Sequence, residues 1–550
     1  MQCSNKPYLL RMAACGVAAF VFCLVFAGVA PNAHAFNADK KAYSKGYRAV
    51  RKGEYPQAEK IFRELLEKDA HDKEARLGLS FTQLKQRNLQ AAYDNAARVI
   101  MLDPLSARGH ALLGTAILGA GEFRLSVEEF RTALALNPDE ALAVAGLAMV
   151  DFYENRLQTA INGLRRAASM DPDEPDYVFS LGQAAARSEK YREAADAYER
   201  FLIVAPKTDT DRRERILGLI AFLRYLGKQG SLYVTAGDDR ATLSFEATDN
   251  RPILLVRVNG GRELLRFVLD TGSGMSVISE ETAKRLNIRP VARGGLARAV
   301  GGGGKFEIVY GYLSSMEMGE VRVENIPVYI RKFFDTNIPV DGYLGLSVVA
   351  KYLTSIDYGT RKMSLVRQNQ TNTIEPWTVR PPEGLLSLAP VAPDDTDTFE
   401  VPLRTTSSGF LSGEVSLEGF EKALNFIVDT AASITVVSEK LSQEEQLLAL
   451  LQPSKMRVFG AAGVAEDVKL LQLPRLSFGA SKLEKINAAV LDMEPVNETA
   501  GFTQSGILGG NFLRHFRIYF DFARGTMRLE PLNRKPNSVE NINQEAIIDQ

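Results

Sequence analysis

The hydrophobic positions of the chain follow one period in the first half and another in the second. Between about residues 39 and 228, apolar residues recur at the spacing of amphipathic helices. Beyond Gly230, glycine, serine, threonine and β-branched residues become frequent, and apolar residues fall in short runs bounded by turns. The pattern predicts an all-α first half and an all-β second half.

A set of prolines marks a regular repeat in the helical half. Its members lie 34 residues apart, the period of a stacked helix-turn-helix unit: Pro104, Pro138, Pro172 and Pro206. Counting back from them gives five units, which begin at Asp39, Lys73, Ala107, Ala141 and Pro175. The eighth and twentieth positions are small, as a close crossing of two helices requires: Gly46, Ser80, Gly114, Ala148, Gly182 and Ala58, Ala92, Ser126, Ala160, Ala194. The twenty-fourth position is mostly large and apolar: Phe62, Ala96, Phe130, Leu164 and Tyr198.

This pattern resembles the tetratricopeptide repeat. The resemblance implies a helical solenoid over residues 36–230, with a capping helix at 211–228 that shields the last unit. The pattern departs at Ala70, where the first proline is missing, and at Ala96, where the large residue is missing. Solenoid surfaces commonly bind peptides or partner helices, so we expect a protein partner on the array. The alternative is an array that serves only as a spacer or folding scaffold.

The second half contains two copies of one β-rich module. In the first copy, strands are predicted at 253–258, 264–269, 277–279, 306–313, 321–323 and 326–330, with a single short helix at 280–286. The closing run Asp341–Leu346 recurs as Ser505–Gly510. Gly345 and Gly509 are 164 residues apart, as are Asp357 and Asp521, which indicates a duplication. We therefore predict modules at 241–368 and 398–534, a proline-rich linker at 369–397 containing Trp377, and a disordered tail at 535–550.

Each module places an aspartate between two apolar strands. The first frame runs from Phe267 to Ser279 around Asp270-Thr271-Gly272-Ser273, and the second from Phe426 to Ser438 around Asp429-Thr430-Ala431. A glycine-rich segment follows each frame, with Gly301, Gly302, Gly303 and Gly304 in the first module and Gly460 and Gly463 in the second. Each module looks like a retropepsin-type aspartic protease, and the tandem resembles a bilobed, pepsin-like enzyme.

The resemblance implies a role for each of these residues. Asp270 and Asp429 would form the catalytic pair, and the glycine-rich segments would be flaps over the substrate. Thr271 and Thr430 would hydrogen-bond across the interface and fix the two loops. The remaining supporting positions are Gly272, Ser273, Ala431, Gly345 and Gly509. The mechanism needs no metal or organic cofactor.

The chemistry of such a pair follows from electrostatics. Two carboxylates about 3 Å apart cannot both ionise, so they share a proton. The ionised one acts as general base toward a water molecule, and the protonated one donates to the scissile carbonyl. The sequence departs from the family at Ala431, where a glycine is usual. If that position needs a positive φ or bare backbone, the methyl group would disturb Asp429; if it needs only a small residue, alanine is compatible with activity.

The first residues are those of an export signal. Lys6 and Arg11 precede an uncharged run over residues 12–30, and Ala33-His34-Ala35 supplies a small-residue cleavage site. We predict a signal peptide at 1–35 and a periplasmic or secreted protein. The alternative is an uncleaved membrane anchor, because 19 residues are just enough to cross a bilayer.

Composition narrows the chemistry of the mature chain. Cys3, Cys15 and Cys23 are the only cysteines, and all lie in the predicted signal, so cysteine nucleophiles, thiolate metal sites and disulfides are excluded from the rest. The sequence contains neither HExxH, the usual motif of zinc hydrolases, nor GxSxG, the usual motif of serine esterases, so it gives no signal of either class. The net charge is −1 for the full sequence and −3 without residues 1–35, which gives no reason to expect a nucleic acid partner.

The sequence thus predicts an exported aspartic endopeptidase with a docking array and a peptide or protein substrate. One alternative is a catalytically inactive pair of lobes that binds extended peptides. The other is a site formed by the first module with a second copy of the chain, the second module being structural.

Overall fold

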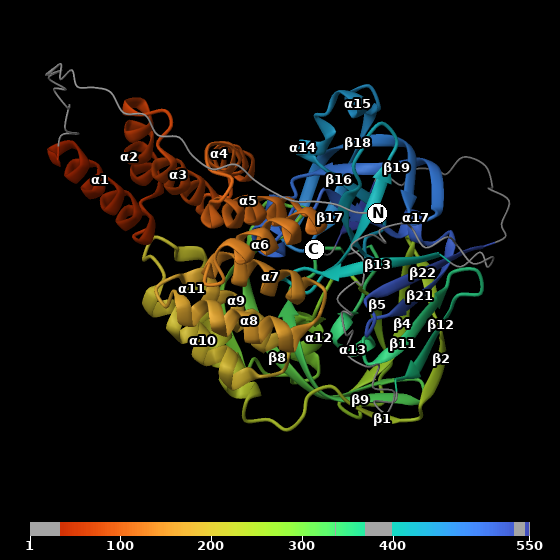
Figure 1. The fold of residues 1–550 in the computed structure, drawn as a ribbon. Helices are drawn as coiled ribbons and strands as arrows, with labels where there is room; N and C mark the ends of the chain where they lie inside the picture. Colours follow the sequence, from red (N-terminus) through yellow and green to blue (C-terminus); the bar gives the residue numbers. More distant parts are fainter. Residues whose placement is uncertain (1–32, 336, 369–398, 533–544, 549–550) are drawn as a thin grey trace, which may run out of the picture.

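The computed structural model describes residues 33–335, 337–368, 399–532 and 545–548 (Figure 1). Most of the predicted signal, the predicted linker with Trp377, and most of the predicted tail lie outside these residues. Within them, a helical array is followed by two β lobes, which confirms the predicted fold class. Among the described residues, no helix is both long enough and apolar enough to cross a bilayer.

The array consists of five helix pairs and one further helix. The first helices of units two to five begin at the residues where the proline period places those units. The bounds are α1 Ala33–Arg51, α2 Tyr55–Lys68, α3 Lys73–Lys85, α4 Leu89–Leu102, α5 Ala107–Ala120, α6 Phe123–Leu136, α7 Ala141–Tyr153, α8 Leu157–Met170, α9 Pro175–Arg187, α10 Tyr191–Val204 and α11 Thr210–Leu226. The last of these, α11, is the helix expected at 211–228.

Two phenylalanine rings of the array, Phe62 and Phe130, each fit against glycines in two successive units. Phe62 is fully buried, and a Cβ added to Gly46 in the same unit would lie 2.6 Å from its ring. A Cβ added to Gly78, in the next unit, would also collide with that ring. Phe130 is enclosed in the same way by Gly114 and Gly146. The second unit has Ala96 where the first and third have these rings. The third unit has Leu112 at the position equivalent to Gly78 and Gly146, so a larger side chain on the facing helix compensates for the missing ring.

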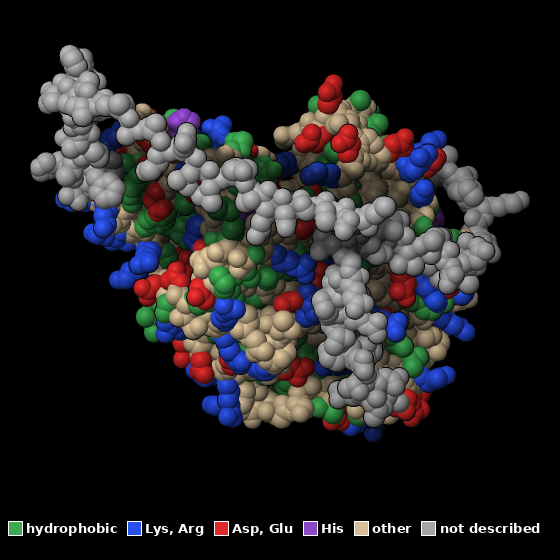
Figure 2. Space-filling model, in the orientation of Figure 1, with side chains coloured by type: hydrophobic (Ala, Val, Ile, Leu, Met, Phe, Trp, Pro, Cys, Tyr) green, Lys and Arg blue, Asp and Glu red, His purple; other side chains and the backbone are tan. Residues whose placement is uncertain are grey.

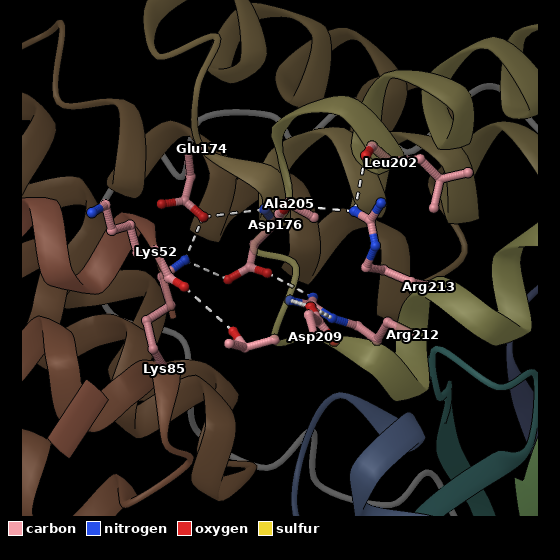
Figure 3. A network of polar contacts seen from close by, with 10 residues as sticks. Lys52, Lys85, Glu174, Asp176, Leu202, Ala205, Asp209, Arg212 and Arg213 are labelled. Carbon is pink, nitrogen blue, oxygen red and sulfur yellow. Dashed lines mark hydrogen bonds and ion pairs between the residues drawn. The ribbon is translucent and has the colours of Figure 1, made fainter. Parts of the chain in front are cut away.

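A cross-array network joins the second unit to the fifth (Figure 3). Lys85 on α3 donates to Asp176 on α9 at 2.6 Å and also contacts Glu174. Arg212 on α11 pairs with Asp176 at 2.7 Å and with Asp209. Desolvation raises the pKa of Asp176, but Lys85 and Arg212 together hold it well below its usual range. The array is therefore curled, with charged side chains bridging the inside of the curve.

Replacing Lys85 with Met should lower the free energy of unfolding by about 2 kcal/mol at pH 5 to 7, because it leaves the buried Glu174 without its cation. The depressed pKa of Asp176 contributes stability that is complete above the unfolded value of about 4 and is lost only as pH falls through the lower folded value. The native network should therefore persist in mild acid. Urea unfolding followed by circular dichroism at pH 5 and 7 measures both effects.

Lys73→Met is the matched control for this variant. Lys73 pairs with Asp103 at 2.8 Å, but half of its side chain is exposed. We expect a change of less than about 0.5 kcal/mol. Equal losses for the two lysines would show that the cross-array network does not stabilise the curl.

The first lobe is built from a nine-stranded sheet together with strands that join the second lobe. Its elements are β1 Val234–Gly237, β2 Arg240–Ser244, β3 Glu246–Thr248, β4 Arg251–Val258, β5 Leu265–Leu269, β6 Ser276–Ser279, α12 Glu280–Arg285, β7 Ala292–Arg298, β8 Lys305–Met318, β9 Val321–Arg331, β10 Gly342–Leu344, α13 Leu346–Val349, β11 Tyr352–Asp357 and β12 Lys362–Arg367. The prediction of separate strands at 321–323 and 326–330 is wrong. A single strand, β9, continues through Asn325, whose φ of +61° absorbs the irregularity that the sequence suggests is a turn.

The second lobe repeats this order. Its elements are β13 Phe399–Thr405, β14 Leu411–Leu417, β15 Leu424–Val428, β16 Thr435–Ser438, α14 Glu439–Ser442, α15 Glu445–Leu448, β17 Leu451–Gly460, β18 Gly463–Phe478, β19 Ser481–Leu491, α16 Glu494–Ala500, β20 Gly506–Leu508, α17 Gly510–Leu513, β21 Phe516–Asp521 and β22 Thr526–Pro531. A last strand, β23 Glu545–Ile548, pairs with β17. The prediction of disorder throughout 535–550 is therefore wrong for these four residues, which complete the unpaired edge of β17.

The two lobes join through a continuous sheet within the one chain. Its strand order is β2-β12-β11-β21-β22-β13, and the seam is the antiparallel pair β11 and β21, with Ser355 opposite Tyr519 and Ile356 opposite Ile518. Ile356 and Ile518 are fully buried. The lobes thus pair with each other, as a bilobed enzyme requires.

The array packs against both lobes. Phe502 of the second lobe is 1% exposed and lies edge-on to Phe123 and Tyr153 of the array, at centroid distances of 4.9 and 5.1 Å. On the first lobe, Phe222 of α11 stacks on Tyr310 of β8 at 4.2 Å. On the face shown in Figure 2, acidic and basic side chains are intermixed. The array is therefore a fixed part of the molecule, held by aromatic contacts at both lobes.

Candidate active site

The two aspartates occupy equivalent places at the ends of buried strands. Asp270 follows β5 and Asp429 follows β15, and both side chains are completely buried. The Asp270 N–H donates to the Leu344 carbonyl at 3.0 Å, and the Asp429 N–H donates to the Leu508 carbonyl at 3.1 Å. Each aspartate is thus held by the closing strand of its own lobe, β10 or β20, which runs parallel to the strand before the aspartate.

Each carboxylate also accepts a hydrogen bond from its own loop. The Gly272 N–H donates to Oδ1 of Asp270 at 2.9 Å, and the Ala431 N–H donates to Oδ1 of Asp429 at 2.7 Å. A backbone donor at this place favours the charged form of a carboxyl group and fixes its orientation. The two loops therefore hold their carboxylates in the same way.

The threonines link the two loops by reciprocal hydrogen bonds. Oγ1 of Thr271 donates to the Val428 carbonyl at 2.8 Å and accepts from the Thr430 N–H at 3.1 Å. Oγ1 of Thr430 donates to the Leu269 carbonyl at 2.6 Å and accepts from the Thr271 N–H at 3.2 Å. All four bonds are buried, and each spans the two lobes. They bring the residues next to Asp270 and Asp429 into direct contact.

The closing glycines lie against the loops from the other side. A Cβ on Gly345 would be 2.6 Å from the Met275 carbonyl carbon, and one on Gly509 would be 2.5 Å from the Ile434 carbonyl carbon. The Gly345 N–H donates to Ser276 Oγ at 3.0 Å. Ser273 donates through Oγ to the Met275 carbonyl at 2.7 Å, which tightens the first loop. Only glycine permits this approach of the closing strand to the loop backbone.

Ala431 is accommodated without strain. Neither it nor Gly272 is among the described residues with a positive φ. The Ala431 side chain is fully buried and packs in a cluster with Ile253, Val268 and Tyr343 of the other lobe. The position therefore needs a small residue and not left-handed backbone, and the methyl group fills space at the interface between the lobes.

Restoring glycine at this position should bring no gain. We expect Ala431→Gly to lower the free energy of unfolding by about 1 kcal/mol, through lost packing and greater freedom of the unfolded chain, and to leave peptide cleavage unchanged or lower. Ala432→Gly, which removes a buried methyl group from the adjacent position, controls for the general effect of the change. A cleavage rate raised about tenfold by Ala431→Gly would show that the methyl group does disturb Asp429.

The two glycine-rich segments, which are the predicted flaps, meet each other. They lie at the tips of the hairpins β7–β8 and β17–β18. A Cβ on Gly302 would be 2.6 Å from the Gly463 backbone, and one on Gly304 would be 2.9 Å from the Ala462 carbonyl. Gly301, Gly302, Gly303 and Gly463 have positive φ values of 76°, 103°, 62° and 145°, and Gly460 lies against the carbonyls of Val300 and Gly301. Val300 belongs to the same buried apolar cluster as Ala432 and Ile434, so the first glycine-rich segment lies near the second aspartate loop.

Two neighbouring residues of the first lobe, Asn250 and Arg251, make polar contacts that the sequence does not predict, and Asn250 reaches the loop that follows Asp429. Nδ2 of Asn250 donates to the Ser433 carbonyl of the other lobe at 3.0 Å, and its Oδ1 accepts from Arg514 at 2.8 Å. Arg251 is fully buried and forms an ion pair with Asp335 at 3.5 Å. A charged residue at the head of an otherwise apolar strand is the signal that could have identified Arg251.

Asp429 interacts electrostatically with Tyr358, the residue that follows β11. Burial raises the pKa of Tyr358, and Asp429 raises it further. The phenol therefore stays protonated. Among the described residues, no cluster of histidine, cysteine and acidic side chains could hold a metal ion.

Comparison with known proteins agrees with both halves of the fold. The family profile described as aspartyl protease matches residues 254–348 and 413–512, one segment in each lobe. Two tetratricopeptide-repeat profiles match residues 49–115 and 146–209. No curated protein matches the chain.

Solved structures similar to the chain include several repeat proteins. A tetratricopeptide-repeat protein of Thermus thermophilus is 23% identical, with a TM-score of 0.29, over 33% of this chain and 98% of the other. PilF of Pseudomonas aeruginosa is 16% identical, with a TM-score of 0.27, over 36% and 86%. MamA from Desulfovibrio magneticus is 20% identical, with a TM-score of 0.22, over 30% and 93%.

The family matches fall on the elements that carry the repeats and on the elements that carry the two aspartates. The helical array is therefore similar to tetratricopeptide-repeat proteins, and each of the two lobes is similar to the aspartyl protease family.

Proposed function

We propose that the chain is an aspartic endopeptidase with one active site, formed between its two lobes around Asp270 and Asp429. The observation that carries the proposal is the set of four buried hydrogen bonds between Thr271 and Thr430 and the loops they face. Those bonds place the aspartate loops side by side with matched backbone donors to each carboxylate. An inactive protein that only binds peptides would not need both the threonine hydrogen bonds and the matched donors to the two carboxylates.

The proposed chemistry uses only these two carboxylates and water. One carboxylate, ionised, removes a proton from a water molecule, which attacks the carbonyl carbon of the peptide bond. The other, protonated, donates to the carbonyl oxygen and stabilises the tetrahedral intermediate. Reversed proton transfers then break the C–N bond, and the amine leaves with a proton. The flaps would exclude bulk water from this reaction.

We also propose that the protein is exported and that its array binds a protein partner. Export is supported by the charged, apolar and small-residue segments of the first 35 residues. Tetratricopeptide repeats generally mediate contacts between proteins, and this array exposes two large apolar side chains, Met101 by 75% near the end of α4 and Leu105 by 74% in the turn that follows it.

Peptide cleavage is tested with the purified full chain and a mixture of unstructured peptides between about pH 3 and 7. New termini are identified by mass spectrometry. We expect cuts at internal bonds that an inhibitor with a tetrahedral hydroxyl group in place of the scissile carbonyl suppresses. No new termini at any pH, from a chain that is folded by circular dichroism, would refute the peptidase proposal.

A further inference from the structure

The edge of the second flap is occupied by the chain's own C-terminal segment. Residues Glu545–Ile548 form β23, which pairs in parallel with β17. Glu545 lies opposite Arg457 and Ile548 opposite Gly460. Gly460 is the last residue of β17 and lies against Val300 and Gly301 of the other flap. The C-terminal strand therefore extends along the flap to the point where the two flaps meet.

The two flaps are covered in different ways. In the first lobe, β7 is the edge strand of its sheet, and α11 of the array packs on it so closely that Gly218 and Gly294 leave no room for a Cβ on either. In the second lobe, the corresponding edge strand is β17, and it is covered by β23. An uncovered edge strand presents unpaired N–H and C=O groups that bind any extended peptide. The β17 edge is thus the flap edge that a peptide can reach by displacing a short strand.

The composition of the tail suits this position. From Lys535 to the end the chain is largely polar, but Ala546-Ile547-Ile548 forms a short apolar run within it. The second lobe ends near Leu532, and Glu545 lies 13 positions further along the chain. An extended chain of that length spans about 40 Å, so the segment can leave the flap and return while it stays tethered. Tethering of this kind gives an effective concentration on the order of 1 mM.

We propose that Glu545–Ile548 is an internal inhibitory strand, which occupies the edge of the second flap where an extended apolar peptide substrate docks. The inference rests on the proposed function for the meaning of the site, although the strand exchange itself does not require hydrolysis. A substrate must displace the segment before it can pair with β17. Release of the segment would raise the affinity of the site for peptides without any change in the catalytic pair.

The test measures binding of a fluorescent peptide with the sequence of residues 544–550 to the full chain carrying Ala546→Pro and Ile547→Pro. Successive N–H groups of a strand point to opposite sides, so the two prolines together remove the one that faces β17. By fluorescence anisotropy we expect about tenfold or more tighter binding to this variant than to the native chain. A control with Glu540→Pro and Asn541→Pro, upstream of the paired strand, should bind like the native chain.

Equal affinity for the native chain and the Ala546→Pro/Ile547→Pro variant, or no binding to either, overturns the proposal. A chain that ends at Leu532 provides a second variant, which should bind the peptide as tightly as the double proline variant. It should also cleave substrates about tenfold faster than the native chain. If the peptide binds as expected and no form cleaves any substrate, the peptidase proposal fails, and only the competition between the C-terminal strand and peptides for the β17 edge stands.

Discussion

Asp270→Asn should lower the rate of peptide cleavage by about a thousandfold or more, because an amide cannot accept the proton of the attacking water. It also cannot share a proton with Asp429 as a carboxylate pair does. Asp429→Asn should have the same effect, and the double variant should be little worse than either single one, because the two residues act as a unit. The measurement is kcat/KM on the best peptide found in the mixture, with thermal unfolding to show that each variant is folded.

Asp357→Asn is the control for the loss of an acidic residue near the seam between the lobes. Asp357 is the last residue of β11 and pairs with Arg517 at 2.8 Å, and it belongs to neither of the paired loops. Its replacement should affect stability more than rate. Retention of more than about a tenth of the native rate by Asp270→Asn would show that the cleavage does not depend on the proposed pair.

Thr430→Val should weaken both the fold and the reaction. The change removes the bonds of Oγ1 to the Leu269 carbonyl and the Thr271 N–H, and leaves both groups buried without those partners. We expect a loss of about 3 kcal/mol in the free energy of unfolding. We also expect a loss of about a hundredfold or more in kcat/KM, because a loop displaced by about 1 Å no longer holds its carboxylate in place.

The symmetry of the threonine contacts supplies the controls for this variant. Thr271→Val removes the equivalent bonds from the other side and should match Thr430→Val in both measurements. Thr430→Ser keeps the hydroxyl group and should recover most of the activity. If Ser and Val at position 430 behave alike, the hydroxyl bonds do not align the loops and packing alone holds the lobes together.

Much of the fold could be predicted because its signals are local or repeated. The 34-residue period recurs along the whole array, and the observed helices α3, α5, α7 and α9 begin where it places the units. The duplicated frames around Asp270 and Asp429 carry the same apolar strands and closing glycines, so each copy supports the other. Repetition averages out the weakness of any single propensity.

The remaining features depend on contacts that no local pattern records. Nothing near Ala431 reveals that its φ is not positive or that its methyl group faces Tyr343 of the other lobe. The run Ala546-Ile547-Ile548 is too short for a period to show a strand; the strand exists because β17 offers an unpaired edge. The sequence likewise does not show that α11 packs on β7, since those segments are far apart in the chain.

The fit of Phe62 and of Phe130 between glycines of two successive units limits how the array can evolve. Loss of the second unit alone would bring Phe62 against Leu112 in place of Gly78. The site beside Phe62 has no space for one side-chain carbon, and leucine would place four carbons there. Loss of the second and third units together would bring Phe62 against Gly146, which already accommodates Phe130. Insertions and deletions in related arrays should therefore come in pairs of units. The segment gained or lost in one step would then be two repeats, or four helices.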